Sequence, residues 1–267
     1  MSRFNDKVVI ITGSSSGIGR AAALRYAAEG ASLTIHGQSG KKLESLKSEL
    51  LNSGVSESRI LVVQGAIEEE LTQDSLIQGT FQKFGKIDVL VNNAGIWLKS
   101  GENPNSVESL KHILDVNVVS LYRLCEIAVP YLEKTKGNIV NISSSLSKVV
   151  QPIKIPYTIS KAAVDHLTHS FAAILASKGI RVNSVNPGLV DTEFHSRSGI
   201  DEDVAKNRIN QYASQSIPLQ RPSTPEEQAD LILYVSSSTT TYMTGANIFN
   251  DGGVGVQPHG IPLTNNS

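Results

Sequence analysis

The chain has little cysteine, no excess of either charge and no long apolar run. Cys125 is the single cysteine among 267 residues, so no disulfide can form within the chain, which fits a reducing compartment. Lys and Arg number 24 and Asp and Glu 25, so there is no basic excess to hold a phosphate backbone. No apolar run approaches the roughly 20 residues of a membrane-spanning helix. We therefore expect a cytoplasmic protein with no membrane span and no nucleic-acid partner.

The sequence does contain a regular alternation of short apolar runs and longer segments of helical period. Several of the runs are rich in Val and Ile with little alternation, as in strands that helices cover on both faces of a parallel sheet. The seven predicted strands are residues 7–12, 31–36, 59–64, 86–92, 137–143, 180–186 and 247–251. The predicted helices are residues 17–29, 40–53, 73–84, 107–132, 157–178 and 225–236. This order predicts an α/β fold, with a doubly wound, mainly parallel seven-stranded sheet and helices on both faces.

No repeat, low-complexity segment or Pro/Gly-rich linker divides the chain, so residues 1–267 are expected to form a single domain. The regular rhythm is broken by a long connection before the last strand. A long insertion at the strand ends of an α/β sheet is usually functional, so residues 188–225 are expected to form a substrate loop or lid. The tail, residues 255–267, is rich in Gly, Pro and Asn and is expected to be partly disordered.

A glycine-rich turn, "TGSSSGIG", follows the first predicted strand and places Gly13, Gly17 and Gly19 before a helix. Glycines there let the backbone turn tightly and approach a ligand, while N–H groups at the helix start attract phosphate. A purely structural turn is the alternative. Two further turns, "NNAG" at 92–95 and "NPGLVDT" at 186–192, follow other strands at the same edge of the sheet. Three such turns on one edge favour dinucleotide binding.

Tyr157 and Lys161 lie four positions apart in "YTISK", within a predicted helix. Residues four apart share a helix face, so the phenol and the ammonium are expected side by side. A nearby cation stabilises phenolate and lowers the pKa of tyrosine from about 10, which suits an acid or base in ketone–alcohol interconversion. Ser144 follows the fifth strand, where its hydroxyl can bind the substrate oxygen. The alternatives are a solvated lysine and a core tyrosine.

These motifs, in this order and spacing, resemble the short-chain dehydrogenase/reductase family over about residues 5–253. The residues that carry the resemblance are "TGSSSGIG", "NNAG", Asn117, Ser144, "YTISK" and "NPGLVDT". The resemblance implies a Rossmann fold and NAD(P)-dependent hydride transfer between a ketone or aldehyde and an alcohol. It implies Tyr157 as general acid/base and Lys161 as the group that lowers its pKa and binds the nicotinamide ribose. It further implies that Ser144 orients the substrate oxygen and that Asn117 holds a water linked to Lys161.

The resemblance also indicates the cofactor contacts, and it implies no metal. The implied contacts are Gly13, Ser15, Gly17, Ile18, Gly19, Gln38, Asn93, Tyr157, Lys161, Val190 and Thr192. Many relatives carry an Asp at the end of the third strand that contacts adenine, and Gly65 stands there in this chain. That contact is not carried over. Ser143 and Ser145 flank Ser144, and the family's spacing selects Ser144.

The choice between NAD and NADP depends on the end of the second strand, in "LTIHGQSGKK". NAD-dependent relatives carry a carboxylate that repels the 2′-phosphate of NADP, and Gly37 stands at that position here. NADP-dependent relatives carry Arg just after it or a basic residue in the glycine turn, where this chain has Gln38 and Ser16. Lys41 and Lys42 supply positive charge nearby, unless they only begin a solvated helix. NADP(H) is therefore favoured, and NAD(H) is the alternative.

The side chains expected to face the substrate are mainly apolar, which favours a small lipophilic carbonyl compound or alcohol. They are Ile96, Trp97, Leu146, Ile153, Leu189 and Phe194, with His195 nearby. Two other functions stay open: a 3-oxoacyl thioester reductase, and a catalytically silent dinucleotide-binding regulator. Enoyl reduction is disfavoured because relatives with that activity separate Tyr and Lys by six residues rather than three. The resemblance also implies a homo-oligomer, a tetramer or a dimer.

Overall fold

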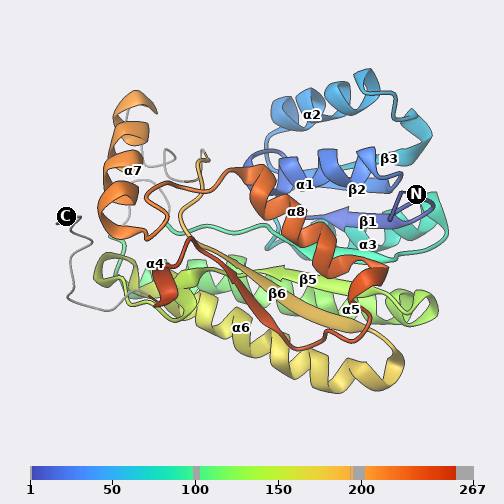
Figure 1. The fold of residues 1–267 in the computed structure, drawn as a ribbon. Helices are drawn as coiled ribbons and strands as arrows, with labels where there is room; N and C mark the ends of the chain where they lie inside the picture. Colours follow the sequence, from blue (N-terminus) through green and yellow to red (C-terminus); the bar gives the residue numbers. More distant parts are fainter. Residues whose placement is uncertain (1, 99–102, 193, 195–201, 257–267) are drawn as a thin grey trace.

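The structure, a computed structural model, describes residues 2–98, 103–192, 194 and 202–256 (Figure 1). Its centre is a sheet of seven parallel strands in the order β3-β2-β1-β4-β5-β6-β7. The strands are β1 (Val8–Ile11), β2 (Ser32–Gly37), β3 (Ile60–Gln64), β4 (Val89–Asn92), β5 (Asn138–Ile142), β6 (Arg181–Pro187) and β7 (Asn247–Asn250). The seven-stranded doubly wound sheet predicted from the sequence is confirmed.

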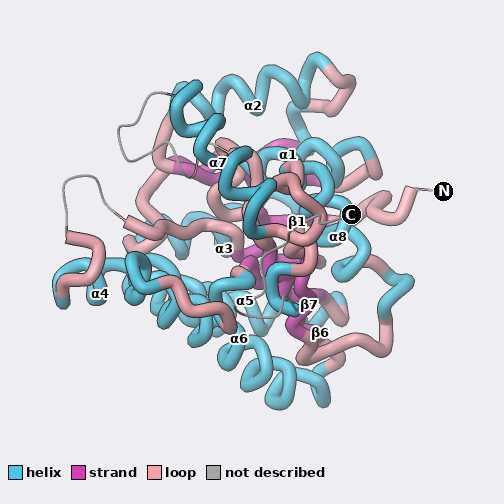
Figure 2. The backbone as a smooth tube through the Cα atoms, turned by 60° about the vertical axis from the view of Figure 1, so that its left-hand side comes forward, coloured by secondary structure: helices cyan, strands magenta, loops and turns pink. Residues whose placement is uncertain are grey.

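Helices cover both faces of this sheet (Figure 2). The α-helices are α1 (Gly17–Ala28), α2 (Gly40–Asn52), α3 (Glu70–Phe84), α4 (Val107–Leu114), α5 (Ser120–Thr135), α6 (Ile155–Leu175), α7 (Glu202–Ser216) and α8 (Pro225–Ser236). Helices α1, α2 and α8 bury one apolar face of the sheet, and α3, α5 and α6 bury the other. In β1, Val9 and Ile11 pack on the first side and Ile10 on the second, which explains why both faces of the strand are apolar.

The single helix predicted over residues 107–132 is wrong in one respect. Helix α4 ends at Leu114, a π-helical turn spans Asp115–Val119, and α5 continues to Thr135. The prediction missed this turn because one extra residue per turn hardly changes the spacing of apolar residues over a long helix. Such turns are often found at functional sites, and this one contains Asn117.

The long connection after β6 leaves the sheet and returns close to where it began. Val190 and Ser223 form an isolated parallel bridge, with Asp191 N–H donating to the Ser223 carbonyl at 2.9 Å and Ser223 N–H to the Leu189 carbonyl at 3.0 Å. Helix α7 lies between these two ends. Part of the predicted loop, including His195, and residues 257–267 of the tail lie outside the described residues. The role of residues 188–225 as a substrate loop stays a prediction.

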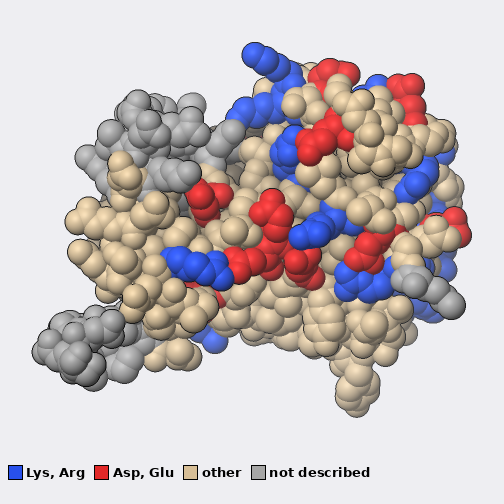
Figure 3. All heavy atoms as spheres, turned by 45° about the horizontal axis from the view of Figure 1, so that its top comes forward, with Lys and Arg blue, Asp and Glu red and all other residues tan. Residues whose placement is uncertain are grey.

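None of the helices in the described ranges is long and apolar enough to cross a lipid bilayer. On the face drawn in Figure 3, acidic and basic side chains are interspersed rather than gathered by sign. That face therefore presents no basic stripe of the kind that binds a phosphate backbone. The cytoplasmic location stays a prediction.

Candidate active site

A cavity of about 760 Å³ opens at the carboxyl ends of the central strands. Strands β1 and β4 are neighbours in the sheet although β2 and β3 lie between them in the chain, so the strand order reverses there. Ligands of open α/β sheets bind at this reversal. The cavity lining includes these residues predicted from the sequence: Gly13, Ser15, Gly17, Ile18, Gln38, Asn93, Ser144, Tyr157, Lys161, Val190 and Thr192. Gly19 and Asn117 are not among the lining residues.

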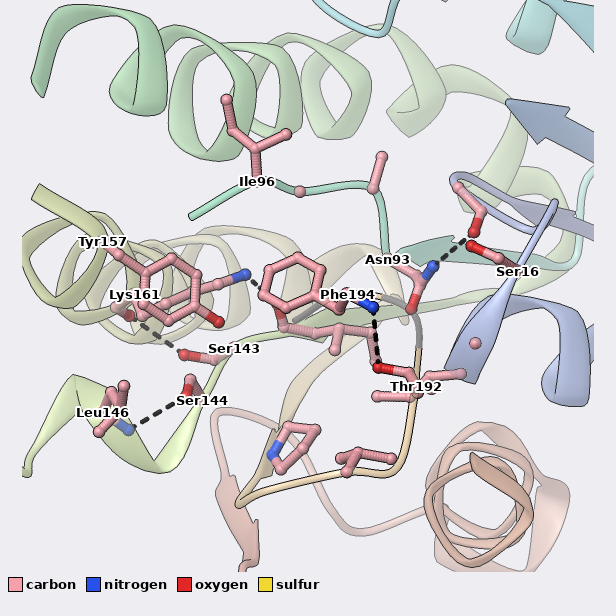
Figure 4. Close-up of a pocket in the computed structure, with 18 of the residues that line it drawn as sticks. Ser16, Asn93, Ile96, Ser143, Ser144, Leu146, Tyr157, Lys161, Thr192 and Phe194 are labelled. Atoms are coloured by element: carbon pink, nitrogen blue, oxygen red, sulfur yellow. Dashed lines mark hydrogen bonds between the residues drawn. The ribbon is translucent and has the colours of Figure 1, made fainter. Parts of the chain in front are cut away.

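The glycine turn packs tightly against the loop after β4. Gly13 has φ of +64°, and a Cβ placed on it would lie 2.9 Å from Ala94 Cα. A Cβ on Gly19 would lie 2.4 Å from Asn93 Nδ2. That amide nitrogen donates to the Thr12 and Gly13 carbonyls at 2.9 and 3.1 Å. Gly19 therefore serves the packing of the turn, while Asn93 ties it to β4 (Figure 4).

The start of α1 faces this cavity and has the properties of an anion-binding site. Its N-cap residue, Ser16, makes no side-chain capping bond, and its first turn holds no acidic residue. Backbone N–H groups at such a helix start carry partial positive charge. A Cβ on Gly17 would lie 3.2 Å from Thr192 Cγ2, so the loop after β6 borders the same opening. The glycine cradle and the uncapped helix start fit the pyrophosphate of a dinucleotide.

Glycines stand at the ends of β2 and β3, where relatives carry carboxylates. A Cβ on Gly37 would lie 2.6 Å from Ser15 Oγ, so a side chain there requires Ser15 to shift. A Cβ on Gly65 would likewise require Thr72, whose hydroxyl lies nearest, to shift. Lys42 lines the cavity beside Gly37.

His36 also lines this end of the cavity, and the sequence prediction did not include it. Its Nδ1 accepts a hydrogen bond of 3.1 Å from Gly13 N–H, so it holds the glycine turn. Burial lowers the pKa of His36 to about 4, which keeps the ring neutral near pH 7. Its place beside the glycine turn is a tertiary relationship, and only its position one residue before Gly37 could have suggested it.

Tyr157 and Lys161 lie side by side on α6, as their spacing predicts (Figure 4). Lys161 Nζ lies 5.6 Å from the centroid of the Tyr157 ring. Both side chains are buried, at 8% and 5% exposure, and both line the cavity. The helix thus presents a phenol and an ammonium to the same space.

The pKa values of this pair differ from the expectation. Burial raises the pKa of Tyr157 to about 12, and a hydrogen bond with Ser144 opposes the rise. Burial also lowers the pKa of Lys161 to about 8, with Asp165 opposing. The protein's own groups therefore do not lower the pKa of Tyr157, because desolvation of the phenolate outweighs the hydrogen bond with Ser144. The positive charge of oxidised nicotinamide would act in the lowering direction.

The serines that follow β5 make different hydrogen bonds. Ser144 Oγ accepts a hydrogen bond of 3.1 Å from Leu146 N–H and lies beside Tyr157. Ser143 Oγ donates to the Lys161 carbonyl at 3.1 Å, which ties the strand to α6. The Ser143 hydroxyl is therefore used for this tie, and the role of Ser144 as the group that meets a substrate oxygen stays a prediction.

Asn117 holds the loop after β4 rather than facing the cavity. Its Oδ1 accepts from Ile96 N–H at 2.9 Å, and its Nδ2 donates to the Ile96 carbonyl at 2.8 Å and to Ser160 Oγ at 3.0 Å. A Cβ on Gly95 would lie 3.1 Å from Asn117 Oδ1 and 3.6 Å from Lys161 Nζ. Asn117 and Lys161 thus approach a common space that a glycine keeps open.

The substrate end of the cavity is mainly apolar, as predicted. Ile96, Leu146, Ile153, Leu189 and Phe194 line it, whereas Trp97, predicted with them, is not among the lining residues. The Phe194 ring centroid lies 6.2 Å from that of Tyr157. The sequence prediction missed Ile209 and Tyr212 on α7 and Ile217 after it, which also line the cavity. No local motif marks these three residues, because their place depends on how the long connection folds back.

Comparison with known proteins gives matches over nearly the whole chain. The model of a protein family described as enoyl-(acyl carrier protein) reductase matches residues 13–255. The chain is 33% identical to a glucose 1-dehydrogenase of Gluconobacter oxydans, over 94% of this chain and 93% of that protein. It is 34% identical to a 3-oxoacyl-[acyl-carrier-protein] reductase of Thermotoga maritima, over 94% and 99%. It is 30% identical to a 3beta-hydroxysteroid dehydrogenase of Eggerthella lenta, over 94% and 95%.

Solved structures show the same relationship. A short-chain dehydrogenase/reductase of unknown function from Caenorhabditis elegans, solved with cofactor, superimposes with a TM-score of 0.92 at 38% identity, over 96% of this chain and 98% of that one. The apo form of a glucose dehydrogenase from the same organism gives a TM-score of 0.81 at 38% identity, over 96% and 100%.

Proposed function

The chain belongs to the short-chain dehydrogenase/reductase family, and on that premise we propose that Tyr157 is the general acid/base of its oxidoreductase reaction. The observation that carries the proposal is the placement of Tyr157, Lys161 and Ser144 on one cavity at the carboxyl ends of the strands. The reaction interconverts a ketone or aldehyde and an alcohol. NADP(H) or NAD(H), held along the glycine turn, supplies or accepts the hydride.

The chain's own residues donate the proton to the substrate oxygen or accept it. With a pKa raised to about 12, the Tyr157 phenol is protonated at pH 7 and can donate its proton to the oxygen of a carbonyl undergoing reduction. Ser144 Oγ hydrogen-bonds the same oxygen and keeps it in line with the phenol. The Lys161 ammonium stabilises the phenolate that remains. In alcohol oxidation the phenolate form of Tyr157 accepts the proton of the alcohol.

Cofactor preference follows from the end of β2, and we propose NADP(H). Gly37 stands where a carboxylate would repel a 2′-phosphate, so that repulsion is absent. Lys42 supplies positive charge at that end of the cavity. Lys41, although adjacent in sequence, is not among the lining residues, so Lys42 is the residue expected to meet the 2′-phosphate.

The relatives differ in substrate, so their names do not identify the substrate of this chain. The apolar lining supports a small lipophilic carbonyl compound or alcohol. Enoyl reduction, which the description of the family model names, fits less well because three residues rather than six separate Tyr157 from Lys161. The 3-oxoacyl thioester reductase is the second candidate, and the Thermotoga maritima relative supports it.

We also propose a homo-oligomer, a tetramer or a dimer, assembled through α5 and α6. Large apolar side chains are exposed in this region: Val119 in the preceding π-helical turn, Tyr122 on α5, and Ile159 and Ile174 on α6. Exposed apolar side chains on these two helices support an interface there. Light scattering after size-exclusion chromatography tests the proposal, and a monomer would overturn it.

The test of function mixes the purified protein with NADPH or NADH and a panel of ketones and aldehydes, and follows nicotinamide absorbance. Wild-type turnover is expected, with kcat lower by about 10²- to 10⁴-fold in Tyr157→Phe. The matched control is Tyr242→Phe, which removes an exposed hydroxyl outside the cavity. Cofactor binding without turnover of any compound in the panel would favour the silent regulator. Full activity of Tyr157→Phe would contradict the proposed role.

A further inference from the structure

The charged side chains in the described lining of the cavity all carry positive charge. Its described lining includes three lysines, Lys42, Lys154 and Lys161, and no aspartate or glutamate. Lys42 lies at the end proposed for the 2′-phosphate, and Lys161 lies beside Tyr157. The dinucleotide therefore accounts for two of the three positive charges. Lys154 remains without a role.

Lys154 lies at the substrate end. It closes a short 3-10 turn, Pro152–Lys154, and is the N-cap residue of α6, three residues before Tyr157. Its Nζ lies 4.5 Å from the centroid of the Trp97 ring. Trp97 Nε1 in turn donates to the Phe194 carbonyl at 3.3 Å. The ammonium thus lies against the Trp97 ring, which is bound to the Phe194 backbone, and the Phe194 ring lies near Tyr157.

Nothing in the described protein neutralises this ammonium. None of the ion pairs among described residues includes Lys154. Burial lowers its pKa, with no carboxylate opposing. A partly buried lysine without a carboxylate partner is costly, and a contact with an aromatic ring offsets only part of that cost. A bound anion would remove the rest.

We propose that Lys154 binds a carboxylate of the substrate, so that the enzyme acts on an oxo acid or the matching hydroxy acid with an apolar body. This inference rests on the proposed function and narrows its substrate class. The carboxylate meets Lys154, the carbonyl meets Tyr157 and Ser144, and the apolar body contacts the lining from Ile153 and α7. A lipophilic substrate remains in agreement with the apolar lining, with an acidic group at one end.

The first experiment compares oxo acids of increasing chain length with their methyl esters as substrates, because the ester keeps the apolar body but lacks the negative charge. In the wild type, kcat/KM is expected to favour the best acid over its ester by at least 10-fold. Lys154→Met should lower kcat/KM for the acid by 10-fold or more and change that for the ester less than about threefold, whereas Lys154→Arg should keep the preference. The matched control is Lys148→Met, because Lys148 also lies over an aromatic ring, 4.3 Å from the Phe249 centroid, but does not line the cavity.

A second measurement does not depend on turnover. Trp97 is the only tryptophan, so its fluorescence reports on the contact with Lys154. Hexanoate should change this fluorescence at concentrations at least 10-fold lower than methyl hexanoate, and Lys154→Met should abolish the difference. Equal response to both probes, or equal turnover of acids and esters, would overturn the inference while leaving the reductase function intact. Turnover of no carbonyl compound at all would instead count against the proposed function.

Discussion

The Lys161 ammonium donates a hydrogen bond of 2.8 Å to the carbonyl of Ile142, the last residue of β5. This bond fixes the cation at the end of a central strand, next to the serines that follow it. The sheet thus places the ammonium directly, while the Asp165 carboxylate acts on it only through its charge.

Replacing Lys161 should separate activity from stability. Lys161→Met is expected to lower kcat/KM by about 10²-fold or more, because the phenolate of Tyr157 loses its cation. The free energy of unfolding should stay equal or rise, since the buried ammonium, whose pKa is lowered to about 8, costs about 3 kcal/mol at pH 7 before its hydrogen bond is counted. Urea unfolding and initial rates measure the two effects. A large loss of stability would show that the hydrogen bond to Ile142 outweighs the cost of burial.

Lys42 should decide between the two dinucleotides. Lys42→Met is expected to raise the Kd for NADPH by about 10-fold, because one charge contact to the 2′-phosphate is lost, and to leave the Kd for NADH within about twofold. Fluorescence titration with each cofactor measures the difference. Lys41→Met is the control, since it removes a neighbouring exposed charge that does not line the cavity. Equal weakening by both substitutions would point to a general effect of charge rather than a specific contact.

Asn117 should act through the loop that carries Ile96. Asn117→Leu removes the partners of the Ile96 N–H and carbonyl and is expected to lower the free energy of unfolding by about 2 to 4 kcal/mol. Hydrogen exchange at the Ile96 amide should become faster than global unfolding predicts. Asn52→Leu, an exposed substitution at the end of α2, is the control. If the Ile96 amide stays protected, the loop is held by other contacts.

His36 should make the protein less stable in mild acid. The pKa of its ring is about 4 in the folded state against 6.5 unfolded, so the unfolded state binds the extra proton between these pH values. Stability present above pH 6.5 is then lost as the pH falls towards 4, by about 3 kcal/mol from this group.

The variant His36→Asn keeps an acceptor near Nδ1 but cannot be protonated, so this part of the pH dependence should disappear. Urea unfolding at several pH values between 4 and 7 measures it. His166→Asn, which removes an exposed histidine, should leave the dependence as in the wild type. An unchanged slope in His36→Asn would mean that the ring is not the group responsible.

Much of the fold follows from the sequence because the strands are buried on both faces. A run such as "VVII" can be recognised without tertiary information. The turns that follow β1 and β4 then place Gly13 and Asn93 at the same edge of the sheet. The Tyr157–Lys161 relationship is equally local, because it depends only on helical spacing. Lys154, His36 and the cavity residues of α7 are different. Their roles depend on which distant segments lie beside them, and no local pattern records this.

The pKa of Tyr157 is a second property that the sequence alone did not predict. The spacing of Tyr157 and Lys161 predicts a cation beside a phenol, which suggests a lower pKa. The depth of burial decides the sign, however, and burial belongs to the whole fold. The π-helical turn at Asn117 could not be predicted from the sequence either, because it hardly changes the spacing of apolar residues along the helix.

The parallel bridge between Val190 and Ser223 closes the base of the long connection after β6. A segment fastened to itself at its base can change in length or sequence while the strand ends keep their positions. The wall contributed by Ile209, Tyr212 and Ile217 can therefore diverge independently of the glycine turn and of the Tyr157–Lys161 pair. During evolution, sequence changes in this connection can therefore alter the substrate range. The cofactor-binding turn and the Tyr157–Lys161 pair need not change with it.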